Sequence, residues 1–120
     1  MKQFIAVGIG GFFGAMTRFG LGQVLPPLNG FPYTTIAINS IGCFLLGWLF
    51  TKYTKRTPII LGVGTGFLGA FTTFSTFSLE TLLLVEQGRW LFACSYVVSS
   101  IVGGLLFATL GVAMARRNVR

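Results

Sequence analysis

Four long apolar stretches, separated by short segments rich in polar residues or proline, dominate the pattern along the chain. A helix needs about 20 apolar residues to cross the hydrocarbon layer of a membrane, and each stretch reaches that length. The stretches are continuously apolar rather than alternating, so membrane-spanning helices are predicted and a β-barrel is not. The pattern predicts an all-α membrane protein, a single domain with spans at about 3–25, 33–53, 58–85 and 89–115.

The composition agrees with a membrane protein and argues against several other classes. Only 9% of the residues are charged, whereas a soluble domain has about 25%. The net charge of +7 comes from basic residues at the ends of the apolar stretches, which does not favour nucleic-acid binding. The chain has no histidine and two acidic residues, so general acid–base catalysis has few candidates and no enzyme is expected. Cys43 and Cys94 lack the spacing of a transition-metal site.

The basic residues are distributed unequally between the two sides of the predicted membrane protein. Four spans place both termini and the middle loop on one side, and Arg89 beside Glu86 on the other. Arg18 lies within the first span. Cytoplasmic loops of membrane proteins are enriched in Lys and Arg, so both termini are predicted to be cytoplasmic, in the cell membrane. The side with the termini carries seven basic residues: Lys2, Lys52, Lys55, Arg56, Arg116, Arg117 and Arg120.

The third stretch contains the sequence GVGTGFLGAF, in which four glycines fall within eight residues: Gly62, Gly64, Gly66 and Gly69. Glycine and β-branched residues are poor helix formers, so a break in the third span is predicted. A break at membrane depth is tolerated only where the released carbonyls and amides meet protein, water or an ion. The third span is therefore expected to carry function.

Immediately after this glycine-rich passage, TTFSTFS combines aromatic rings with hydroxyl groups. Phe74 and Phe77 are three residues apart and share a helix face, and Ser75 and Thr76 flank them. Two phenylalanines alone are typical of ordinary packed or lipid-facing positions. A ring edge, however, carries partial positive charge, and with hydroxyl donors and the amide of Asn39 it would make a weak, narrow path for an anion.

Three strongly polar side chains lie inside predicted spans, where such groups are costly. Arg18 has two interpretations, a cation that reaches to the membrane surface or an attractor for anions at a pore mouth. Asn39 either makes a hydrogen bond between helices or binds a ligand directly. Glu80 either lines a pore or accepts structural hydrogen bonds.

At these residues the chain resembles the Fluc (CrcB) family of fluoride channels. The motifs are GGFFGAMTR, TTIAINSIGCFLLG and GFLGAFTTFSTFSLET, and the resemblance extends over essentially the whole chain. The resemblance implies half of an antiparallel dimer with two fluoride pores near the interface, each lined by both subunits. It implies that Asn39 is the pore asparagine, that Phe74 and Phe77 are the paired rings, and that Ser75 and Thr76 belong to a polar track alongside.

The same resemblance assigns roles to further residues. Arg18 matches a vestibule arginine, Glu80 a third-span glutamate and Tyr96 a fourth-span tyrosine. Gly69 and Thr72 match a helix break whose backbone carbonyls, two from each subunit, hold a structural Na⁺. The implied function is passive export of fluoride from the cytoplasm, which relieves its toxicity.

The chain departs from the family in two respects. Gly104 stands where some members carry a pore serine, which puts one position of the polar track in doubt. The strong charge bias predicts a single insertion direction, whereas a homodimer needs both directions. We therefore hypothesise a heterodimer with an oppositely inserted paralogue, with a homodimer as the alternative. The competing class is a small multidrug exporter with four spans, but its hallmark glutamate in the first span is absent here.

Overall fold

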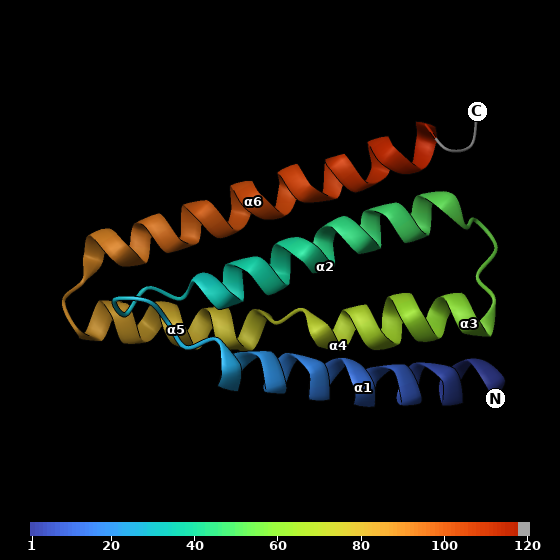
Figure 1. Ribbon diagram of the computed structural model, residues 1–120, viewed down its shortest axis with the longest axis horizontal. Coiled ribbons are helices and arrows are strands. Elements are labelled where there is room, and N and C mark those ends of the chain that lie inside the picture. Colours follow the sequence, from blue (N-terminus) through green and yellow to red (C-terminus); the bar gives the residue numbers. More distant parts are fainter. Residues whose placement is uncertain (118–120) are drawn as a thin grey trace.

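The computed structural model describes residues 1–117, and within that range the chain is helical with no strand (Figure 1). Four helices are long and apolar enough to cross a membrane, as the hydrophobic pattern predicted, so the all-α class is confirmed. Arg120, which contributed to the charge map, lies outside the described residues. The elements are α1 (Lys2–Val24), α2 (Tyr33–Lys52), α3 (Pro58–Leu61), the π-helical segment η1 (Gly62–Leu68), α4 (Gly69–Phe71), α5 (Phe74–Glu86) and α6 (Trp90–Arg117).

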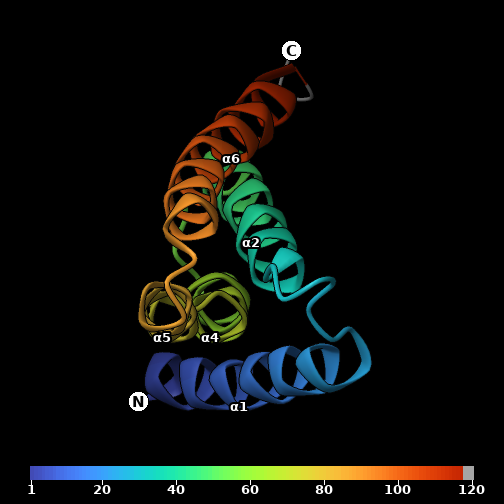
Figure 2. The same ribbon diagram turned by 90° about the vertical axis from the view of Figure 1, so that its left-hand side faces the viewer.

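The third span is a composite of four helical segments from α3 to α5, and it forms the middle of the molecule. In Figure 2, α1 lies on one side of this span, and α2 and α6 lie on the other side. Three segments lie at the same end of the bundle: the beginning of α1, the loop between α2 and α3, and the end of α6 (Figure 1). The basic residues that are distant in sequence are thus brought to the same end.

Glycine allows α1 to approach the third span at backbone contact. A Cβ atom added to Gly10 would collide with the carbonyl group of Gly62, and one added to Gly14 would collide with the carbonyl group of Phe67. Small residues permit such close approach between helices in lipid, where packing rather than hydrophobic burial drives association. The glycines of the first and third spans therefore serve the same contact.

The glycine-rich passage is helical, and the chain leaves the helix only after it. Residues 62–68 form π-helical turns, whereas Thr72 and Thr73 are extended, with ψ angles of 154° and 123°. The predicted break is present, but it begins several residues beyond the centre of the glycine run. Packing against α1 compensates for the poor helix propensity of glycine, so propensity alone misplaced the break.

Few large side chains are buried inside the single chain. One cluster combines Leu84, Ala93 and Tyr96 with partly buried neighbours that include Phe31 and Phe77. Many other large apolar side chains are exposed, including most of those on α1 and α6. Apolar exposure on this scale is expected for a protein whose outer surfaces face lipid or another subunit.

Candidate functional site

Asn39 on α2 holds the extended backbone at the break in the third span. Its side-chain oxygen accepts a hydrogen bond from the backbone N–H of Thr73 at 2.8 Å. Its Nδ2 donates to the carbonyl of the same residue at 3.0 Å. One amide side chain thus satisfies both backbone groups that would be costly to leave unpaired in lipid. An amide nitrogen has two N–H groups, and these bonds use one of them.

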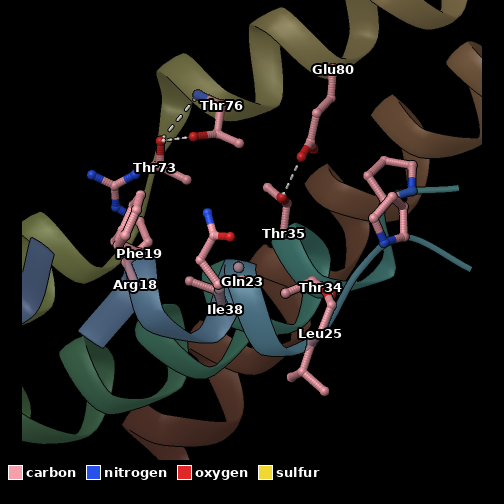
Figure 3. Close-up of a pocket in the computed structure, with 13 residues that line it drawn as sticks. Arg18, Phe19, Gln23, Leu25, Thr34, Thr35, Ile38, Thr73, Thr76 and Glu80 are labelled. Carbon is pink, nitrogen blue, oxygen red and sulfur yellow. Dashed lines mark hydrogen bonds between the residues drawn. The ribbon is translucent and has the colours of Figure 1, made fainter. Parts of the chain in front are cut away.

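The side chain of Thr73 restarts the helix after the break. Its hydroxyl accepts a hydrogen bond from the backbone N–H of Thr76 at 3.1 Å, which is an N-cap of α5. The same hydroxyl lies 3.0 Å from the hydroxyl of Thr76, to which it donates (Figure 3). It lies 3.3 Å from the hydroxyl of Ser75. The sequence analysis did not single out Thr73, although a threonine directly before a helix start is a common cap.

These bonds release backbone carbonyls on the N-terminal side of the break. In a continuing helix, the N–H of Thr73 would pair with the carbonyl of Gly69, and the N–H of Thr76 with that of Thr72. Both N–H groups are instead bonded to side chains, those of Asn39 and Thr73. The carbonyls of Gly69 and Thr72 therefore lose their helical partners. The hydroxyl of Thr72 lies 3.4 Å from the Gly69 oxygen, at the limit of a hydrogen bond.

Glu80 on α5 accepts hydrogen bonds from two other spans. The hydroxyl of Thr35 on α2 donates to Oε1 at 3.0 Å (Figure 3). The phenol of Tyr96 on α6 donates to Oε2 at 2.6 Å, and Tyr96 is fully buried. Thr35 was not expected to contribute, yet it lies one helical turn before Asn39 and hence on the same face of α2. The carboxylate thus joins three helices.

A first cavity of about 270 Å³ is lined by two charged side chains that lie away from the ends of their spans. Arg18 and Glu80 line it, together with Thr35, Thr73 and Thr76 (Figure 3). The Nε of Arg18 donates to the carbonyl of Ala70 at 3.0 Å, next to the break. A cation and hydroxyl donors therefore border the same space.

A second cavity of about 330 Å³ also borders the break. It is lined by Asn39, Thr73, Phe74 and Phe77, among others. Thr73 borders both cavities, and its hydrogen-bond partner Asn39 borders the second.

The two phenylalanine rings occupy different environments in the second cavity. Their centroids are 5.7 Å apart. Phe77 packs against Tyr96, with 5.2 Å between ring centroids. Phe74 is 79% exposed. The structure brings the rings together on one face and leaves one of them uncovered by its own chain.

The α6 wall of the second cavity has one polar group that the sequence analysis missed. Ser100 lines the cavity, and its hydroxyl oxygen is buried without a hydrogen-bond partner among residues 1–117. Ser100 follows Tyr96 by one helical turn and precedes Gly104 by one. This spacing places it on the same helix face as those two residues, and it could have been predicted from the sequence on that basis. Gly104 also lines the cavity, and a Cβ atom there would meet Cys43 Sγ at an ordinary 3.6 Å.

The fold and this site define a small multi-pass membrane protein with polar groups and cavities around an interrupted span. Residues 5–112 match the family described as "CrcB-like protein, Camphor Resistance (CrcB)". The chain is 47% identical to the fluoride-specific ion channel FluC of Oceanobacillus iheyensis over an alignment of 120 positions, which covers 96% of this chain and 92% of that relative. It is also 47% identical to the fluoride-specific ion channel FluC 1 of Bacillus cereus strain ATCC 10987, over 90% of this chain and 83% of the relative.

The chain therefore belongs to the CrcB family, as its motifs indicated. The relatives are named as channels, which confirms the prediction that this protein is not an enzyme.

Proposed function

We propose that this protein is a passive, fluoride-selective channel that exports fluoride from the cytoplasm and so relieves its toxicity. The relatives named fluoride-specific ion channels support the choice of anion. The single observation that carries the proposal is the hydrogen-bonded pair of Asn39 and Thr73, of which Thr73 borders two cavities. One of these cavities is bordered by Arg18, and the other by Phe74 and Phe77.

The chemistry of the two cavities suits a strongly hydrated anion. Arg18 attracts the anion into the first cavity, and the hydroxyls of Ser75 and Thr76 and the second N–H of Asn39 replace water along the path. The edges of Phe74 and Phe77 carry partial positive charge and add weak attraction without a full charge. Weak binding at successive sites favours conduction, because each step can be reversed quickly. Glu80, held by Thr35 and Tyr96, positions the wall of the first cavity.

We further propose that the functional unit is an antiparallel dimer with two pores. A second subunit would cover Phe74, which its own chain leaves 79% exposed, and would complete the second cavity. The partner is either a second copy of this chain or an oppositely inserted paralogue. The charge bias favours the paralogue, with both termini of this chain in the cytoplasm and the dimer in the cell membrane. Reporters fused to the C-terminus and found in quantity on both sides of the membrane would instead favour the homodimer.

A structural Na⁺ fits the released carbonyls at the break. Oxygen atoms of unwound backbone are suitable ligands for a hard cation. The carbonyls of Gly69 and Thr72 have lost their helical partners to Asn39 and Thr73, so they are available for such a role. When bound, the ion would supply positive charge that neutralises these dipoles and links the breaks of the two subunits.

Fluoride release from liposomes tests the proposed function. Phe77→Ile removes the ring, and Asn39→Asp keeps the acceptor for Thr73 but replaces the N–H donors by negative charge. Both variants are expected to reduce fluoride efflux to that of protein-free liposomes, measured with a fluoride electrode. Phe12→Ile is the matched control, because this exposed ring on α1 lines neither cavity, and it should retain efflux.

Two results would contradict this function. If liposomes that contain the wild-type protein release chloride as readily as fluoride, a fluoride-selective channel is excluded. Wild-type rates in both Phe77→Ile and Asn39→Asp would exclude the assigned pathway. Gel filtration and circular dichroism of each variant show whether it is folded, which separates a lost pathway from a lost structure.

A further inference from the structure

One end of the bundle carries positive charge that is not neutralised within the described chain. Six basic residues lie at this end, on the start of α1, in the α2–α3 loop and on the end of α6 (Figure 1). Both acidic residues of the protein, Glu80 and Glu86, lie on α5, whose C-terminal end points to the opposite end of the bundle. The basic residues are Lys2, Lys52, Lys55, Arg56, Arg116 and Arg117.

Two of these cations are held above aromatic rings at the end of the second span. The Nζ of Lys52 lies 4.6 Å from the ring centre of Trp48 and 5.6 Å from that of Tyr53. The guanidinium of Arg56 lies 4.0 Å from the ring centre of Phe50. All three distances are within the range of cation–π attraction. These contacts reduce the freedom of two long side chains before any partner arrives.

We infer that this surface, formed by Trp48, Lys52, Tyr53, Lys55 and Arg56, binds the headgroups of anionic phospholipids. The cations complement the phosphate in charge, and each basic residue near a membrane surface contributes about 1 kcal/mol to the attraction of anionic lipid. Trp and Tyr are enriched at the depth of the headgroups, where the apolar ring and the polar tip are both satisfied. The surface lies at the end of a membrane span, so lipid is the anion that is always within reach.

The opposite end of the bundle provides an internal contrast. Its cation, Arg89, donates from Nη2 to the carbonyl of Asn29 at 2.9 Å and lies 4.2 Å over the ring of Phe92. Glu86 precedes it by three residues and reduces the local positive charge. This end therefore has aromatic rings, including exposed Trp90, but no excess of cations.

The two tryptophans of the chain report on the two ends separately. Trp90→Phe leaves Trp48 as the only tryptophan, and Trp48→Phe leaves Trp90. Each variant is reconstituted in phosphatidylcholine with increasing fractions of brominated phosphatidylglycerol or brominated phosphatidylcholine, which quench nearby tryptophan. Both leaflets have the same composition, so the result is independent of insertion direction. Trp48 is expected to prefer the anionic lipid about fivefold for each cation engaged, and Trp90 to show no preference.

Neutralising the surface completes the test. In the Trp90→Phe background, replacing Lys52, Lys55 and Arg56 together by Gln should abolish the preference at Trp48, and raised ionic strength should weaken it. Arg89→Gln in the same background is the matched control and should leave the preference intact. Equal quenching of Trp48 by the two lipids, or a preference that survives the triple substitution, would overturn the inference. Neither outcome depends on fluoride conduction, so this test can fail while the proposed function stands.

Discussion

The third span contains two regions that are stabilised in opposite ways on either side of its break. Residues 58–71 pack closely because their glycines have no side chain, and Gly62, Gly64 and Gly66 are buried in η1. Residues 74–86 form α5, of which Leu84 is buried within the described chain. There, the side chain of Thr73 caps the first turn, and the hydroxyls of Thr35 on α2 and Tyr96 on α6 donate hydrogen bonds to the carboxylate of Glu80.

This difference separates the scaffold from the site. The region before the break is fixed by backbone contact with α1, which leaves no room for a Cβ atom at Gly10, Gly14 or Gly66 and offers few functional groups. The region after the break presents hydroxyls, rings and a carboxylate, most of them only partly covered. The break lies between these regions. The region before it is the scaffold, and the region after it carries the functional groups. Substitutions that affect each side separately test this division.

The largest effect is expected in the region before the break. Gly10→Ala places a methyl group against the carbonyl of Gly62 and so forces α1 away from η1. Overpacking against backbone is expected to cost about 3 kcal/mol or more. Thermal unfolding in detergent, followed by circular dichroism, should show a markedly lower midpoint.

Gly8→Ala is the matched control for this substitution. Nothing lies within 4 Å of a Cβ atom at Gly8, and alanine is the better helix former, so stability should be unchanged or slightly raised. Equal stability of Gly8→Ala and Gly10→Ala would mean that the backbone contact does not hold the first region.

The contrast between the two regions also explains how far the sequence could be interpreted. The four spans follow from the length of the apolar stretches, because lipid leaves the chain few alternatives. The polar residues inside spans also stood out, because each is costly in lipid. The resemblance to the family added Tyr96, whose bond to Glu80 joins α6 to α5.

What the sequence did not reveal depends on contacts between distant segments. The position of the break depends on Asn39, 34 residues away from its partner Thr73. The role of Thr35 as a hydrogen-bond donor depends likewise on Glu80, which is 45 residues further along the chain. For Asn39 and Glu80 the sequence left a structural and a functional alternative open. The geometry shows that each residue makes the structural bonds and also lines a cavity, so the alternatives do not exclude one another.

A medium effect is expected where α5 is joined to α6. Tyr96→Phe removes the hydroxyl that donates to Glu80 at 2.6 Å but keeps the buried ring. Loss of a hydrogen bond to a carboxylate costs about 2 kcal/mol. Tyr53→Phe, at an exposed position outside this cluster, is the control and should leave the unfolding midpoint unchanged. If Tyr96→Phe unfolds at the wild-type midpoint, packing rather than hydrogen bonding holds the second region.

The smallest effect on stability is expected at the cap that restarts the helix after the break. Thr73→Ala removes the acceptor for the N–H of Thr76, and the loss of an N-cap side chain costs about 1 kcal/mol. Thr73→Ser keeps the hydroxyl and should remain close to wild type. Hydrogen exchange resolves where the change acts, with faster exchange expected in the first turn of α5 and unchanged exchange in η1. Faster exchange on both sides of the break would show that the two regions unfold as one unit, because a division at Thr73 confines the effect to the region that the cap begins.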